Sequence, residues 1–179
     1  LASRQTDIEH TGSGWNLAAA SGLTPGTLCR AKLVALSLLI VPAVTGQSLG
    51  IITLARFRGL SVALDVGPWV TYTLLLALVN TAMCAYHLWL AAVVENQLVV
   101  MSAGLLGGFI GVYMLLAPAS VARLVPWGYY AVISCARMEG ATARYTAPAP
   151  GWVAGFLVLS AVLFAVATRR LDRIERGSS

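Results

Sequence analysis

Four long apolar stretches constrain the fold of this chain more than any other feature. They cover roughly residues 31–55, 68–94, 98–119 and 151–168. A helix that crosses a bilayer needs about 20 predominantly apolar residues. Hydrophobic residues make up 58% of the chain and charged residues only 11%, whereas soluble domains carry about 25% charged residues. We therefore predict an all-α, polytopic helical membrane protein with four spanning helices and a transmembrane domain over residues 31–168.

The connections between these stretches differ in length. Residues 56–67 form a polar loop, and residues 95–97 a tight turn that makes the second and third helices an antiparallel hairpin. Residues 120–150 form the longest connection, and its apolar run over 124–136 is too short to span a bilayer. Pro126 and Gly128 also interrupt that run. We predict an interfacial or re-entrant segment at the outer surface.

Basic residues flank the first and last apolar stretches. Arg30 and Lys32 precede the first stretch, and four arginines follow the last one within a predicted tail, residues 169–179. Four crossings place both ends on one side, and basic flanks favour the cytoplasm. We therefore expect a plasma-membrane protein whose two termini both lie in the cytoplasm. The net charge of +5 then reports membrane orientation rather than nucleic-acid binding.

Motifs for catalysis or metal binding are not found in the sequence. The three cysteines are widely spaced and form no CxxC or CxxH pattern, which argues against a disulfide framework and a zinc site. The signatures of metalloproteases, serine hydrolases and nucleotide-binding P-loops are absent as well. Asp7, Glu9 and His10 are close in sequence but lack further ligands, so we interpret them as a solvated helix face. We expect neither enzymatic activity nor a bound metal or cofactor.

Small residues recur at four-residue spacing in the predicted helices. Glycines at this spacing allow helix backbones to approach closely in lipid. They could pack helices within one subunit, or they could form a seam between subunits or a gating contact. The candidate interface glycines are Gly46, Gly50, Gly104, Gly107, Gly108 and Gly111.

Two polar residues lie on one face of the second predicted helix. Asn80 and His87 are seven residues apart, about two helical turns. Polar side chains in a spanning helix usually face the protein interior. An interhelical hydrogen bond would explain them, and so would a substrate path or a proton relay.

The opening segment resembles type-2 ABC exporter permeases. The resemblance rests on Glu9, on Gly14-Trp15-Asn16-Leu17, on Ser21-Gly22-Leu23-Thr24-Pro25-Gly26 and on Arg30-Ala31-Lys32 before a spanning helix. The tight hairpin, the outer segment and the basic tail agree with it. It is most similar to the branch associated with export of, and immunity to, lantibiotic or bacitracin-type peptides.

The resemblance implies that residues 1–30 form a cytoplasmic, amphipathic coupling segment. Glu9, Trp15 and Asn16 would contact a partner subunit that carries ATP and Mg²⁺, and a second permease subunit, identical or different, would complete the transporter. The implied activity is export of a peptide antibiotic or another amphipathic compound. The family has six spanning helices, so the two that precede the coupling segment would be missing from this chain. The family usually has a proline before the small residue of its turn, whereas here Pro25 follows Gly22.

Two other functions remain open from the residues alone. A proton-coupled carrier or a membrane enzyme would use His87 and Asn80. A membrane scaffold or sensor that transports nothing would depend on no ATP-hydrolysing partner.

Overall fold

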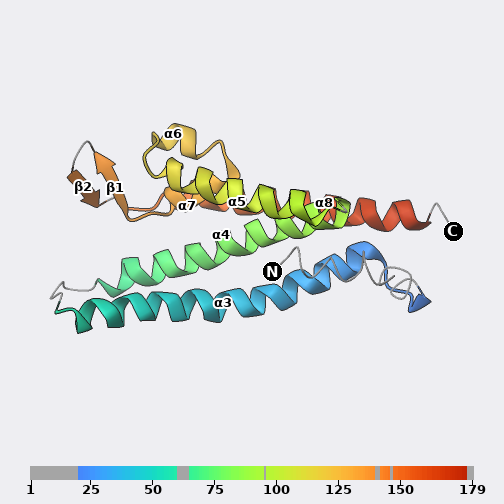
Figure 1. Cartoon of the computed structure of the whole chain (residues 1–179), viewed down its shortest axis with the longest axis horizontal. Helices are drawn as coiled ribbons and strands as arrows, with labels where there is room; N and C mark the ends of the chain where they lie inside the picture. Colours follow the sequence, from blue (N-terminus) through green and yellow to red (C-terminus); the bar gives the residue numbers. More distant parts are fainter. Residues whose placement is uncertain (1–19, 60–64, 95, 140–141, 146, 177–179) are drawn as a thin grey trace.

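Four long helices dominate the structure, a computed structural model that describes residues 20–59, 65–94, 96–139, 142–145 and 147–176. They are α3 (Pro25–Phe57), α4 (Val66–Val93), α5 (Gln97–Met114) and α8 (Pro150–Arg176) (Figure 1). Each of them is long and apolar enough to cross a membrane. This confirms the prediction of a helical, multi-pass membrane protein with four candidate spans.

A lobe of short elements connects α5 to α8. It contains α6 (Ala119–Ala122), the 3₁₀ helix η1 (Pro126–Gly128), α7 (Tyr129–Val132) and the strands β1 (Ala136–Glu139) and β2 (Thr142–Tyr145). The two strands pair antiparallel, with Ala136 opposite Tyr145. This β-hairpin was not predicted from the sequence, and it is a small addition to a fold that is consistent with the predicted all-α class. An interfacial or re-entrant position of the lobe stays a prediction.

Helix α3 begins earlier than predicted. Its N-cap is Thr24, whose side chain accepts a hydrogen bond from the Thr27 amide, and Pro25 occupies the first helical turn. A hydroxyl N-cap followed by proline is a favoured way to start a helix. Residues 25–30 therefore lie within α3, and a coupling role of residues 1–30 stays a prediction.

Two other helix boundaries also differ from the prediction. Helix α5 ends at Met114 rather than near residue 119, because Pro118 follows and disfavours helical backbone in the residue before it. Helix α8 continues to Arg176. The basic residues after 168 thus extend the last helix instead of forming a separate tail, consistent with the good helix propensity of arginine and leucine.

Helices α3, α4 and α8 pack against one another, while α5 packs mainly on η1 and α7. One buried cluster lies where α4, α7 and α8 meet and includes Val79, Ile133 and Val153. A second cluster of Cys29, Leu36 and Leu88 lies where α3 and α4 meet, with α8 beside it. Large apolar side chains such as Leu38 and Leu105 point outward. Outward-facing apolar side chains suit lipid as the solvent.

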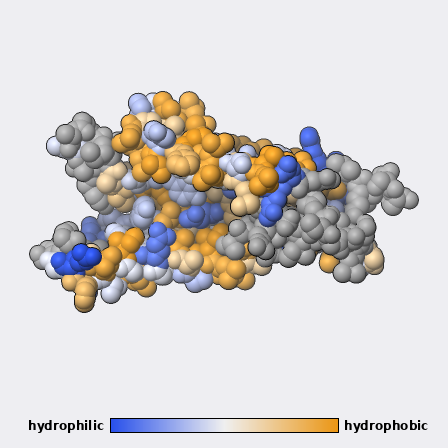
Figure 2. Space-filling model, in the orientation of Figure 1, coloured by the Kyte–Doolittle hydropathy of each residue, from blue (hydrophilic) through white to orange (hydrophobic). Residues whose placement is uncertain are grey.

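The surface of the molecule is also divided into hydrophobic and hydrophilic regions. Figure 2 shows hydrophobic residues over most of the visible outer faces and hydrophilic residues along the middle of the view, between α3 and the side formed by α5 and the lobe. At one end of the bundle lie the start of α3 and the end of α8, and near the other lies the lobe (Figure 1). We call these the basic end and the lobe end.

Candidate functional site

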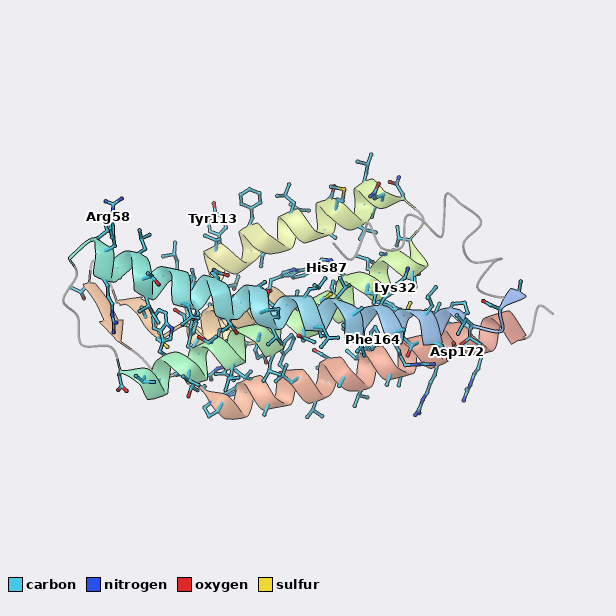
Figure 3. All side chains as sticks on the ribbon, turned by 90° about the horizontal axis from the view of Figure 1, so that it is seen from below. Lys32, Arg58, His87, Tyr113, Phe164 and Asp172 are labelled. Atoms are coloured by element: carbon cyan, nitrogen blue, oxygen red, sulfur yellow. The ribbon has the colours of Figure 1, made fainter. Side chains whose placement is uncertain are left out.

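A polar junction ties the first turn of α3 to the last turns of α8 at the basic end (Figure 3). Asp172 of α8 is only 8% exposed. One of its carboxylate oxygens accepts a hydrogen bond from the Gly26 amide at 2.8 Å, and the other accepts one from Arg30 Nη2 at 3.0 Å. Arg30 also donates to the hydroxyls of Thr168 and Thr27, at 3.2 and 2.9 Å. These five residues, Gly26, Thr27, Arg30, Thr168 and Asp172, are the polar junction.

The chemistry of a helix start explains this arrangement. Amides in the first turn of a helix have no partner within the helix, and the helix dipole favours a negative charge there. The Asp172 carboxylate satisfies the Gly26 amide and sits at the positive end of α3. A side chain at position 26 would overlap the Thr168 carbonyl and the Asp172 carboxylate. Glycine is therefore required for α3 and α8 to approach this closely.

The polar junction was not predicted from the sequence. Arg30 was interpreted as a signal of membrane orientation, and Asp172 lay within the predicted basic tail. A carboxylate among arginines at the end of an apolar helix, together with a Pro-Gly helix start, is the signal that could have suggested it. The pairing of residues so far apart in sequence depends on α3 and α8 being neighbours.

Asn80 makes a hydrogen bond between elements. Its carbonyl oxygen accepts from the Tyr130 hydroxyl of α7 at 3.0 Å, and its amide nitrogen donates to the Leu76 carbonyl at 2.9 Å. Burial raises the pKa of Tyr130, so this phenol stays protonated and can donate. The structure therefore places Asn80 in a hydrogen bond between helices, one of the three interpretations that the sequence left open.

His87 lies among aromatic side chains (Figure 3). Its ring centroid is 5.3 Å from that of Tyr86 and 6.2 Å from that of Trp127 in η1. Within the described ranges, His87 makes no hydrogen bond or ion pair. Asn80 and His87 thus form no hydrogen bond with each other. Their separate contacts with Tyr130 and Trp127 bring α4, α7 and η1 together.

The candidate interface glycines divide into two groups. Gly104 lies beside the His87 ring, Gly107 lies directly against the Trp127 indole, and Gly111 faces the Trp127 carbonyl. These three glycines let the lobe and α4 pack closely on α5. Positions 46, 50 and 108 have open space around them in the part of the chain that the structure describes, so their role between subunits stays a prediction.

The predicted partner contacts Glu9, Trp15 and Asn16 lie outside the described residues, as do Asp7 and His10. Cys29, Cys84 and Cys135 are not in disulfides. Across the described ranges, no three His, Cys, Asp or Glu side chains gather closely enough to hold a metal ion.

Hydroxyl pairing also links two of the spanning helices. Ser48 of α3 and Thr73 of α4 are joined by a hydrogen bond of 2.6 Å between their hydroxyls. Such bonds contribute about 0.6 kcal/mol on average in membrane proteins. The sequence analysis did not single out either residue, because serine and threonine are common in spanning helices.

Comparisons with models of known protein families, with curated proteins and with solved structures found no match to this chain.

Proposed function

We propose that this chain is a membrane-spanning permease subunit of a type-2 ABC exporter. It would export a peptide antibiotic or another amphipathic compound, and so confer resistance or self-immunity. A partner subunit would hydrolyse ATP, and a second permease subunit would complete the transporter. The proposal rests on the resemblance of the opening segment, on the four candidate spans and on the position of the polar junction.

The polar junction is the observation that carries the proposal. Residues 1–24 precede α3 directly, so a force applied to them reaches the first turn of α3. Asp172 and Arg30 then connect that turn to α8. Packed helices that move as units are a common way to link a distant binding event to a rearrangement. A partner that moves the opening segment would therefore move α3 and α8 together.

The interior of the bundle is compatible with an amphipathic substrate. Asn80 and His87 provide polar groups on α4, and Tyr86 and Trp127 provide aromatic surface beside them. Helix α5, which packs mainly on the lobe, borders the same region. We propose that an amphipathic compound passes along this side of α4.

Co-purification tests the proposed partner. The full chain is produced together with a candidate ATP-binding subunit, and the amount of that subunit retained is measured. We expect Glu9→Ala and Trp15→Ala to reduce retention, because a charge contact and a buried aromatic anchor are lost. Asp65→Ala is the matched control, since Asp65 lies at the opposite end of the helices. Unchanged retention and unchanged ATP-driven export in both variants would refute the proposal.

His87→Ala separates this function from a proton-coupled carrier. An ATP-driven exporter keeps ATP-dependent transport in this variant, with a changed affinity for its substrate. A carrier that relays protons through His87 loses transport altogether. Transport assayed in vesicles, with ATP or with a pH gradient as the energy source, distinguishes the two.

A further inference from the structure

Arg123, at the lobe end, has no anionic partner among the residues that the structure describes. Its Nε is buried and donates no hydrogen bond within the residues that the structure describes. Its guanidinium carbon lies 4.8 Å from the centroid of the Trp152 ring at the start of α8. Across the described ranges, Arg123 also forms no ion pair. A buried donor on a charged group is costly when it has no acceptor, so this guanidinium is expected to take an anion.

Arg123 lines a pocket at the lobe end. The other lining residues include Ser134 and the small residues Ala119, Ala131 and Ala149. The volume of the pocket is about 70 Å³, which is room for several water molecules. Ser134, whose hydroxyl hydrogen-bonds the backbone of Ala136, adds a polar residue to the lining. The pocket can thus accept a small polar group next to a positive charge.

Apolar side chains that are near Arg123 in sequence or that contact it are exposed. Leu124 is 82% exposed, Trp152 53% and Val121 42%. In Figure 2 the lobe carries a largely hydrophobic surface. At the end of a spanning bundle, a cation beside exposed apolar and indole groups matches the region where lipid headgroups meet acyl chains.

We propose that this pocket binds the phosphate group of an anionic membrane lipid, with the lipid chains lying along Leu124, Val121 and Trp152. The planar guanidinium presents paired N–H donors that fit phosphate oxygens. A soluble phosphate would use the same donors and would gain nothing from the exposed apolar side chains near Arg123. This inference does not depend on the proposed transport function, because it concerns the other end of the molecule.

Native mass spectrometry of the purified full chain tests the site. Three probes separate the parts of the ligand: phosphatidylglycerol, diacylglycerol with the same chains and no phosphate, and inorganic phosphate as a competitor. We expect Arg123→Gln to weaken phosphatidylglycerol binding roughly tenfold, the loss of one charge-assisted hydrogen bond. Diacylglycerol binding should not respond to this substitution.

Arg58→Gln is the matched control, because Arg58 is an exposed arginine beyond the end of α3 and undergoes the same change of charge. It should leave phosphatidylglycerol binding unchanged. Arg123→Lys keeps the charge and loses the planar donors, so it should bind phosphatidylglycerol less tightly than the wild type and more tightly than Arg123→Gln. This milder variant also tests the site if the glutamine variant does not fold.

The outcomes are distinct. Equal phosphatidylglycerol binding by the wild type and both Arg123 variants overturns the proposal. Equal losses in Arg58→Gln and Arg123→Gln also overturn it, because binding would then follow net charge alone. Full displacement of phosphatidylglycerol by inorganic phosphate would support the phosphate site and overturn the lipid as its source.

Discussion

The two ends of the bundle differ in the interactions that an arginine makes. At the basic end, Arg30 donates to Asp172 and to two threonine hydroxyls, and Asp172 also binds the Gly26 amide. At the lobe end, Arg123 has an aromatic ring beside it and a buried Nε without a described acceptor. The difference is that the first cation joins two helices, whereas the second leaves a donor without an acceptor, which is the basis of the proposed lipid site.

The geometry of the helices explains this contrast. The basic end brings a helix start against a helix end, so a carboxylate on α8 meets both a free amide and a guanidinium on α3. The lobe end consists of short elements that each contribute few side chains. A closed joint suits the transmission of movement, whereas an open pocket suits binding.

Gly26→Ala should have the largest effect on stability. The added methyl group overlaps the Thr168 carbonyl and the Asp172 carboxylate, so the two helices must separate and the junction opens. Overpacking and a lost hydrogen bond together should cost about 3 kcal/mol. Thermal unfolding in detergent measures the loss. Gly46→Ala on the same helix has open space around it and should be slightly stabilising, by about 0.5 kcal/mol; equal behaviour of the two variants would contradict the close contact.

Asp172→Asn should weaken the same joint less. The amide oxygen can still accept from the Gly26 amide, but the charge opposite Arg30 is lost. We expect a cost of about 2 kcal/mol in the free energy of unfolding. Asp65→Asn provides the comparison, since Asp65 makes no side-chain capping bond at the start of α4. If both substitutions cost the same, Asp172 does not hold the helices together.

Tyr130→Phe probes how the lobe is held on α4. It removes the hydroxyl that donates to Asn80 and retains the ring. Such bonds contribute about 0.6 kcal/mol in membrane proteins, and we expect a loss of that size. Tyr113→Phe serves as the control, because Tyr113 is 69% exposed on α5. A lobe held only by apolar packing would show no difference between the two variants.

The same substitution at both arginines gives the smallest and most direct contrast. In lipid-free detergent, Arg30→Gln should cost about 1 kcal/mol, because its bonds are partly exposed to solvent. Arg123→Gln should cost about 0.5 kcal/mol, because the contact with the Trp152 ring is lost but no described hydrogen bond is. A loss as large as that of Arg30→Gln would show that Arg123 has a further partner within the protein.

Much of the fold was predictable because lipid imposes a simple rule. Any helix that crosses a bilayer needs a long apolar run, and the four runs are visible in the sequence. Helix ends were less predictable: the first boundary was placed at the apolar edge near residue 31, although Thr24 and Pro25 carried the start signal. The β-hairpin of β1 and β2 was not predicted. The apolar run over 124–136, interrupted by Pro126 and Gly128, led us to interpret the whole connection as an interfacial or re-entrant segment.

The candidate site was predictable only in part. Asn80 and His87 stood out as polar residues in an apolar helix, but the partners Tyr130 and Trp127 come from a connection whose fold was unknown. Asp172 and Arg123 looked like ordinary surface charges. Their different environments arise from which helices are neighbours, and a single sequence does not specify that pairing.

Orientation is the claim on which the contrast between the two ends depends. In the proposed exporter, the basic end faces the cytoplasm, where ATP is present, and the lobe end faces outward. Cys29, Cys84 and Cys135 are first replaced by serine, and then Arg169→Cys and Arg58→Cys are introduced separately. Intact cells are treated with a membrane-impermeant maleimide. The account predicts labelling of the Arg58→Cys protein in intact cells and of the Arg169→Cys protein only after permeabilisation; the reverse pattern would contradict it.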